Sequence, residues 1–171
     1  MNKMRNVEIE KLTLNIGTGK SQEKLEKGLK LLRMLTGATP VKTITKKRIP
    51  GWGLRPGLPV GCKVTIRKGK VSELIASLLK AKDNTLGESN FDKEGNISFG
   101  IAEYIDIPNV KYDPEIGIMG LQVCISLKRK GYRIKNRKQK RRTIPKKHRI
   151  TKEEAKKFME ENFGVKVEEE R

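Results

Sequence analysis

The sequence predicts an α+β fold, a mostly antiparallel sheet with two helices packed on one face, followed by a basic C-terminal arm and a short terminal helix. Strict alternation of apolar and polar residues marks four strands, and apolar stripes at helical spacing mark the two helices. With one further strand, the order is strand, helix, strand, strand, helix, strand, strand. This order is typical of the split β-α-β arrangement of ferredoxin-like and RNA-recognition-motif folds.

The first strand is predicted at residues 11–16, where apolar and polar side chains alternate. After a glycine-containing turn, Ser21 can cap an amphipathic helix that reaches Gly37, because serine suits an N-cap and glycine commonly ends helices. Residues 41–46 are rich in β-branched side chains, which favours a second strand.

Residues 48–61 contain three prolines and four glycines, which excludes regular structure and predicts a long loop. Loops of this length are usually functional or disordered. Residues 62–67 alternate again and form the third predicted strand. Ser72 can cap the second helix, whose apolar stripe ends before the polar stretch 83–95.

Residues 97–102 and 121–128 alternate and predict the last two strands. With helices on one face, the other face stays open, and its hydroxyls, amides and cations suit phosphate and sugar oxygens. A merely solvated face is the alternative for any single residue, but the set lacks acids in a chain that has 20. Its members are Lys11, Thr13, Asn15, Lys63, Thr65, Arg67, Ser98, Gln122, Ser126 and Lys128.

The net charge of +19, from 39 basic and 20 acidic residues, indicates an anionic partner, and nucleic acid is the obvious one. A membrane partner is not expected, because the sequence has no apolar run of about 18 residues and no basic amphipathic helix with an aromatic face. Residues 1–10 carry charges where a secretory signal needs an apolar stretch, so we expect a cytosolic chain.

Residues 128–149 hold 13 basic residues and no acid. We expect this segment to bury nothing by itself and to order against phosphate, with a solvated tail as the alternative. Thr151 and Glu154 form a capping box for a short helix that ends at Gly164, and residues 168–171 are expected to fray. The predicted division is an α+β RNA-binding domain at 1–128 and an arm with its helix at 129–171.

No enzyme, cofactor or metal site is expected. Residues 19–21 read Gly-Lys-Ser between a strand and a helix, but Leu14 stands where a phosphate-binding P-loop needs its first glycine. His148, the only histidine, lies in the basic segment, and no Ser or Cys nucleophile has an identifiable base. Cys62 and Cys124 lack metal-ligand spacing, and we interpret both as small buried residues.

Aromatic residues are absent from the outward strand positions, so recognition is expected through backbone and shape more than through base stacking. Trp52, at the tip of the long loop, is the exception. A tryptophan at such a position usually packs back onto its own protein, and contact with a partner is the second interpretation.

Several segments together resemble the L-five family of large-subunit ribosomal proteins, over roughly residues 7 to 128. They are Leu14-Asn15-Ile16-Gly17-Thr18-Gly19, Thr36-Gly37, Pro40-Val41, Lys46-Lys47, Ile49, Gly57-Leu58-Pro59-Val60-Gly61-Cys62-Lys63-Val64-Thr65, Phe91-Asp92, Gly95-Asn96 and Gly100. The basic arm and terminal helix look like the archaeal and eukaryotic branch, whose eukaryotic member is called L-eleven.

The resemblance implies a structural role in the cytoplasmic ribosome. It implies binding to 5S rRNA, attachment of 5S rRNA to 23S-type rRNA in the central protuberance, contact of the long loop with P-site tRNA, and contact with small-subunit protein S-thirteen across a subunit bridge. Neighbouring large-subunit proteins are further implied partners. Carried over by position, Asn15 and residues 46–48 match the region that meets 5S rRNA, and residues 57–59 match the tRNA-facing loop. Ala38 departs from the glutamine of bacterial members, which puts a side-chain contact there in doubt.

The complete expectation joins the open face, the long loop and the arm. The expected rRNA-binding residues are Lys11, Thr13, Asn15, Lys46, Lys47, Arg48, Lys63, Thr65, Arg67, Lys128, Arg129, Lys130, Arg133, Lys135, Arg137, Lys138, Lys140, Arg141 and Arg142. The expected tRNA-facing residues are Trp52, Arg55, Gly57, Leu58 and Pro59. The alternatives are a nucleotide-dependent enzyme, which rests on the turn at 17–21, and a free nucleic-acid-binding regulator, which rests on charge alone.

Overall fold

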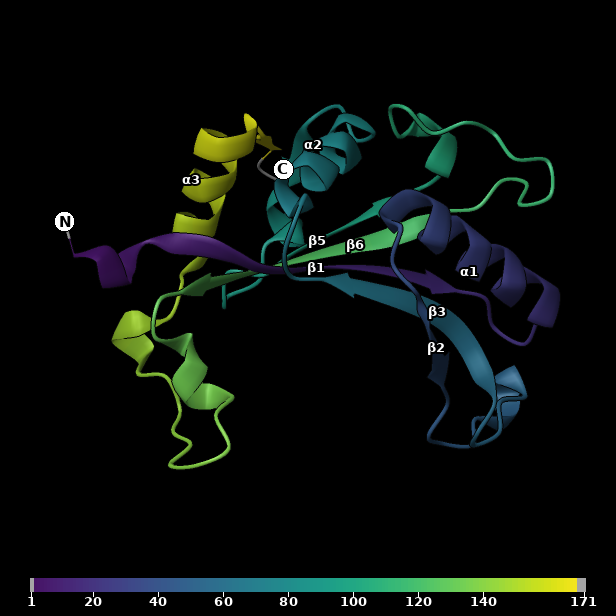
Figure 1. The fold of residues 1–171 in the computed structure, drawn as a ribbon, viewed down its shortest axis with the longest axis horizontal. Coiled ribbons are helices and arrows are strands. Elements are labelled where there is room, and N and C mark those ends of the chain that lie inside the picture. Colours follow the sequence, from purple (N-terminus) through teal and green to yellow (C-terminus); the bar gives the residue numbers. More distant parts are fainter. Residues whose placement is uncertain (1, 169–171) are drawn as a thin grey trace. The chain divides into compact units, whose positions relative to one another are not determined.

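The computed structural model describes residues 2–168 and has the predicted α+β fold, with a mostly antiparallel five-stranded sheet and three helices (Figure 1). The sheet order is β2-β3-β1-β6-β5, and β4 pairs with β7 in a second, parallel sheet. The elements are β1 (Val7–Gly17), α1 (Gln22–Thr36), β2 (Val41–Ile44), β3 (Pro59–Ile66), α2 (Val71–Lys80), β4 (Thr85–Gly87), β5 (Ile97–Ile101), β6 (Leu121–Arg129), α3 (Lys152–Phe163) and β7 (Lys166–Glu168).

The chain forms two compact units, and β1, β5 and β6 contribute residues to both. The first unit contains the described parts of residues 1–12, 67–99 and 124–171, and the second contains residues 13–66 and 100–123. The arm and α3 therefore belong to the same unit as α2. The division at residue 128 that the sequence suggests stays a prediction.

In the second unit, α1 begins and ends as predicted. The Ser21 hydroxyl accepts a hydrogen bond from the Lys24 amide, and Gly37 closes the helix with φ +66°. The helix approaches β3 closely at Gly28, because a Cβ there would lie 3.0 Å from the Cys62 sulfur. Leucines of α1 and the inward residues of β1 and β3 form this core, as the alternation predicts.

The long loop is shorter than predicted, because β3 already begins at Pro59 and a 3-10 turn forms at Pro50–Trp52. Pro59–Gly61 can be extended because the Val60 carbonyl accepts hydrogen bonds from two amides of the β1–α1 turn, at 3.0 and 3.1 Å. Gly61 is required there, since a Cβ would lie 2.5 Å from the Ile16 carbonyl oxygen. The prediction of irregular structure through residue 61 was therefore wrong at the strand end, and β2 ends at Ile44, short of the predicted residue 46.

In the first unit, α2 and α3 lie on one side of the strands and the arm lies on the other (Figure 1). The prediction that Ser72 caps α2 was wrong, because the helix begins at Val71 and Lys70 is its N-cap, without a side-chain hydrogen bond. The capping box of Thr151 and Glu154 is confirmed, with both reciprocal hydrogen bonds present.

The pair β4–β7 was not predicted, because three-residue strands carry too little pattern to be recognised. Glu88, which follows β4, binds Lys152 at 2.9 Å and Lys156 at 3.0 Å, and this joins the segment to α3. Glu168, expected to fray, is the last residue of β7. Residues 169–171 lie outside the described residues, so the expectation of fraying there stays a prediction.

The two cysteines differ, which corrects the interpretation of both as buried. Cys62 is fully buried between α1 and the sheet, and burial raises the pKa of its thiol to about 11. Cys124 is exposed, because it occupies an outward position of β6, where Val123 and Ile125 face the core. The alternation of the strand was a better guide than the usual burial of cysteine.

Candidate nucleic-acid interface

The outward residues of the second unit form a small polar surface on neighbouring strands. The Asn15 amide nitrogen on β1 donates to the Gln122 side-chain oxygen on β6 at 2.9 Å. The hydroxyl oxygens of Thr13 and Thr65 are 3.5 Å apart, and Lys63 is exposed on the same strand as Thr65. In this pairing, the Asn15 side-chain oxygen and the Gln122 side-chain nitrogen have no hydrogen-bond partner among the described residues.

A shallow groove of about 480 Å³ adjoins the Asn15–Gln122 pair. Gly17 and Gly100 line it, and a Cβ at either position would meet nothing within 4 Å, so the protein itself does not require glycine there. Glycine at such places lets the backbone of a partner approach closely. The groove and the amide pair together suit the sugar-phosphate backbone of a nucleic acid.

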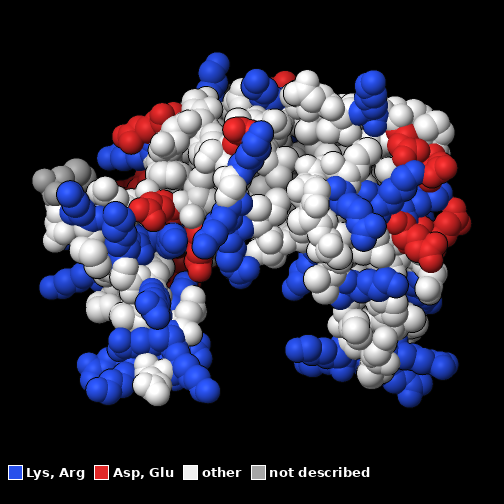
Figure 2. Space-filling view, viewed as in Figure 1, with Lys and Arg blue, Asp and Glu red and all other residues white. Residues whose placement is uncertain are grey.

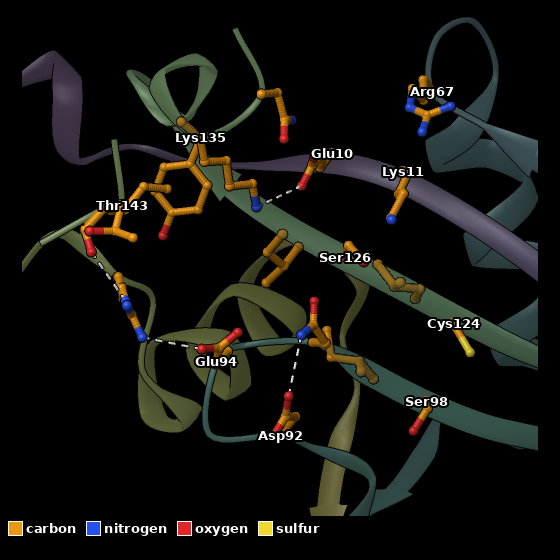
Figure 3. A pocket seen from close by; sticks show the side chains of 18 residues that line it. Glu10, Lys11, Arg67, Asp92, Glu94, Ser98, Cys124, Ser126, Lys135 and Thr143 are labelled. Carbon is orange, nitrogen blue, oxygen red and sulfur yellow. Dashed lines mark hydrogen bonds and ion pairs between the residues drawn. The ribbon is translucent and has the colours of Figure 1, made fainter. Parts of the chain in front are cut away.

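The outward residues of the first unit lie differently. Lys11, Arg67, Ser98 and Ser126 line a concave surface that the arm also borders (Figure 3). Lys128, half-buried near the end of β6, does not line it. The sequence predicted these residues as part of an open face, and the structure places them in the lining of a cavity, with Arg67 and Ser98 still exposed.

The basic loop, residues 45–58, is an ordered hairpin. Ile49 pairs with Leu54, which is buried, and the Thr45 amide and hydroxyl both bind the Leu58 carbonyl. Trp52 is 68% exposed, so the interpretation that it packs back onto its own protein was wrong. Leu58 and the strand residue Pro59 are half-buried. The exposed members of the predicted set are Lys46, Lys47, Arg48, Trp52, Arg55 and Gly57.

The arm, residues 128–149, is more structured than its composition predicts. Ile144 is buried, the Tyr132 hydroxyl donates to the His148 carbonyl at 3.2 Å, and the His148 ring lies 2.9 Å from the Lys130 carbonyl. The expectation that the segment buries nothing was therefore wrong. Lys140 has φ +48°, a conformation that costs a lysine about 1 kcal/mol and is found more often at functional positions.

The cations of the arm fall into two groups, according to whether a carboxylate binds them. Figure 2 shows Lys and Arg gathered at the lower left, where no Asp or Glu is visible in this view. The paired cations bind carboxylates outside the arm: Arg129 binds Glu154, Lys130 binds Glu8 at 3.9 Å, Lys135 binds Glu10 at 3.8 Å, and Arg149 binds Glu94 at 3.2 Å. Among residues 2–168, the unpaired cations have no carboxylate within 4.0 Å. They are Lys128, Arg133, Arg137, Lys138, Lys140, Arg141, Arg142, Lys146 and Lys147.

Arg129 differs from the other predicted rRNA-binding residues, because it is only 5% exposed. Its guanidinium is directed at Glu154 in α3, so the side chain holds the base of the arm to that helix. The unpaired cations, by contrast, are exposed except for the half-buried Lys128. No carboxylate of residues 2–168 lies within 4.0 Å of them. These side chains are the ones available to a polyanion.

The acidic loop, residues 102–120, was missed by the sequence reasoning, although four acidic residues against one lysine were a visible signal. Three apolar side chains are exposed on it: Ile105 at 38%, Tyr112 at 54% and Ile118 at 70%. The buried Tyr104 hydroxyl accepts a hydrogen bond from the Asp113 amide at 2.9 Å. Charge of this sign with exposed apolar groups suits a basic protein better than RNA.

Lys30 of α1 holds the acidic loop in place. Its ammonium lies 2.8 Å from the Asp113 carboxylate and also binds Glu115. The hydrogen bond with Asp113 raises the pKa of Lys30, and the same bond lowers the pKa of Asp113. Because the Asp113 pKa is lowered by folding, its stabilising effect is present above about pH 4 and is lost as the pH falls through the lowered pKa.

Replacing Lys30 with methionine should loosen the acidic loop, because both carboxylates lose their common cation. We expect faster hydrogen exchange at the amides of Asp113 and Glu115, with the amides of β3 unchanged. In the wild-type protein, lowering the pH below about 4 should increase the exchange of the Asp113 and Glu115 amides relative to that of the β3 amides, because Asp113 becomes protonated. Equal exchange in the two proteins at neutral pH would show that the ion pairs do not hold the loop.

Among residues 2–168, no group of three or more His, Cys, Asp or Glu side chains could hold a metal ion. Within the same range, no helix is long and apolar enough to cross a bilayer.

Comparisons with known proteins show the family of this chain. Residues 2–55 match the family described as Ribosomal protein L5, and residues 59–161 match the C-terminal part of the same ribosomal family. The large ribosomal subunit protein uL5 of Sulfolobus acidocaldarius is 49% identical over 97% of this chain and 93% of its own length. Those of Nanoarchaeum equitans and Methanosphaera stadtmanae are 48% and 45% identical over 96% and 98% of this chain, and over 97% and 100% of their own lengths. The chain therefore belongs to the ribosomal protein L5 family.

Proposed function

We propose that this chain, a structural constituent of the large subunit of the cytoplasmic ribosome, binds 5S rRNA and helps attach it to 23S-type rRNA in the central protuberance. The role is structural rather than enzymatic, in keeping with the family. The observation that carries the RNA-binding proposal is the set of unpaired arm cations, which no carboxylate of residues 2–168 neutralises. A polyanion is the partner that such a set requires.

The polar surface of the second unit supports recognition of shape in addition to charge. Asn15 and Gln122 offer a donor and an acceptor at fixed positions, and the glycine-lined groove beside them admits a backbone. Contacts between the arm cations and phosphates would supply affinity. The side-chain amides of Asn15 and Gln122 would fix the position of the protein along the RNA. A free regulator that binds by charge alone would lack this second contribution.

The test compares 5S rRNA with a random DNA duplex of similar length at about 0.2 M salt. We expect 5S rRNA to bind at least tenfold more tightly, because charge alone distinguishes the two poorly under these conditions. In ribosomes, the protein should sediment with the large subunit and leave together with 5S rRNA when the subunit is stripped. Equal affinity for both nucleic acids would refute the proposal and favour the regulator.

The proposal includes contact of the basic loop with P-site tRNA, supported by the exposure of Trp52 beside Arg55 on an ordered hairpin. Trp52 is the only tryptophan of the chain, so the fluorescence of a tryptophan analogue, excited at longer wavelength and incorporated into this chain before assembly into large subunits, reports on this loop alone. Binding of tRNA to large subunits should quench this fluorescence or shift its emission, because the indole would lose water. Unchanged emission with tRNA bound would exclude contact at Trp52.

The proposed partner of the acidic loop is small-subunit protein S-thirteen across a subunit bridge. The support is the excess of acids and the exposed apolar side chains on a loop that Lys30 anchors. Neighbouring large-subunit proteins are the other proposed protein partners.

A further inference from the structure

A cavity of about 1000 Å³ lies in the first unit, between the strands and the arm (Figure 3). Its size is at the upper end of ligand sites, which run from about 300 to 1,000 Å³, and it has room for a nucleotide but not for a helical segment of RNA. Lys11, Ser98, Cys124 and Ser126 point into it from β1, β5 and β6. The arm supplies the opposite wall.

The charge left over inside the cavity is positive. Glu10 is bound by Lys135 and Glu94 by Arg149, so these two pairs cancel. The Asp92 carboxylate accepts hydrogen bonds from the Lys93 amide at 2.6 Å and the Asn96 side chain at 3.3 Å. Lys11 and Arg67 also line the cavity, and neither has a carboxylate within 4.0 Å among the described residues. The Asp92 charge is therefore not cancelled, and four cations against three carboxylates leave one positive charge in the lining. Lys11 and Arg67 are the lining cations available to a phosphate group.

The wall on the arm side offers a different chemistry. Ile144 and Tyr132 both line this wall, Ile144 with 8% of its surface exposed and Tyr132 half-buried. The Lys135 ammonium lies 5.1 Å from the centre of the Tyr132 ring. Asn136 and Thr143 add an amide and a hydroxyl at the same wall. An apolar face with hydrogen-bonding groups at its edge is the usual environment for a nucleobase removed from its stack.

We propose that this cavity binds one unstacked nucleotide of the RNA, with the phosphate at Lys11 and Arg67 and the base against Ile144 and Tyr132 of the arm. The inference rests on the proposed RNA-binding function and adds a specific pocket to it. The chemistry recognised is that of a nucleoside monophosphate, whether free or within a strand. An unstacked position in single-stranded RNA is the source that we favour, because the unpaired arm cations lie on the same segment and would hold the rest of the strand.

The wild-type protein contains a reporter for this site. Cys124 is exposed and lines the cavity, whereas Cys62 is fully buried and its pKa is raised to about 11. A thiol-alkylating reagent near pH 8 should therefore modify Cys124 and spare Cys62. The rate of Cys124 alkylation, read by mass spectrometry, measures whether the cavity is occupied.

The experiment measures this rate for the full chain alone, with each of the four nucleoside monophosphates, with single-stranded RNA pentamers, with 5S rRNA and with a lysine pentapeptide. Binding of 5S rRNA is measured in the same samples. We expect at least tenfold protection by 5S rRNA and by pentamers at saturation, and weaker protection by mononucleotides, which lack the additional phosphate contacts. If 5S rRNA binds without protecting Cys124, the pocket is refuted while the proposed function stands. If 5S rRNA does not bind, the proposed function itself fails.

A cavity-filling variant distinguishes a nucleotide bound inside the cavity from RNA that only covers its opening. Ser126→Tyr fills the floor without changing charge, and Ser72→Tyr, on an exposed position of α2, is the matched control. We expect Ser126→Tyr to weaken 5S rRNA binding about tenfold with an unchanged salt slope, because a base is excluded while every phosphate-binding cation remains. Unchanged affinity in Ser126→Tyr would overturn the proposal. Protection of Cys124 by the lysine peptide but not by RNA would also overturn it, in favour of a basic protein segment.

Discussion

Replacing Lys138, Lys140, Arg141 and Arg142 together with glutamine should lower the affinity for rRNA on the order of 100-fold at about 0.15 M salt. These side chains belong to the unpaired arm cations, so no carboxylate of residues 2–168 neutralises their charge. Every cation–phosphate interaction that the substitutions remove should also flatten the plot of log affinity against log salt by about one unit, so a change of up to about four units is expected. Titrations of 5S rRNA and 23S-type rRNA fragments at several salt concentrations measure both effects.

A matched control removes the same charge elsewhere. Lys24, Lys80, Lys82 and Lys157 are exposed and lie outside the arm and outside the predicted interface. Glutamine at these four positions should change the slope by less than one unit, because long-range attraction is screened beyond about 8 to 10 Å at these salt concentrations. Equal effects of the two quadruple variants would mean that net charge, and not the arm, governs binding.

Replacing Glu154 with alanine should destabilise the protein by about 3 kcal/mol. Arg129 is 5% exposed and its Nε has no partner among the described residues, so Glu154 is the group that compensates its charge. Without Glu154 the guanidinium stays buried and unpaired. The reverse change, Arg129→Met, should cost less, because Glu154 is 42% exposed and can be hydrated when its partner is removed. Urea unfolding of the two variants measures this asymmetry.

Glu154 also completes the capping box of α3, so part of its effect is local. Thr151→Ala removes the other half of the box and should cost about 1 kcal/mol, which gives the contribution of capping alone. If Glu154→Ala costs no more than Thr151→Ala, the ion pair with Arg129 contributes nothing measurable. Because Arg129 is located at the base of the arm, Glu154→Ala is also expected to increase hydrogen exchange in residues 130–135.

Some features of the site could be predicted because they depend on neighbouring residues. Alternation assigned Asn15 and Gln122 to outward positions, and the structure brings them to 2.9 Å. The capping box and the Gly37 terminus were visible for the same reason, since capping acts within one turn of helix. Ser72 was misassigned because the sequence does not distinguish a serine that caps a helix from a serine inside its first turn. The structure places Ser72 inside the helix.

The sequence by itself determined the α+β class, the order of the main elements and the presence of an acid-free basic segment, because each of these is expressed in periodicity or composition over a short stretch. Only the tertiary structure decided which arm cations are neutralised, because Glu8, Glu10, Glu94 and Glu154 come from distant parts of the chain. It also made part of the predicted open face one wall of a cavity, since residues of the arm line the other wall. Ion pairs between residues far apart in the sequence depend on how the folded backbone places their side chains. Local sequence patterns do not contain this information.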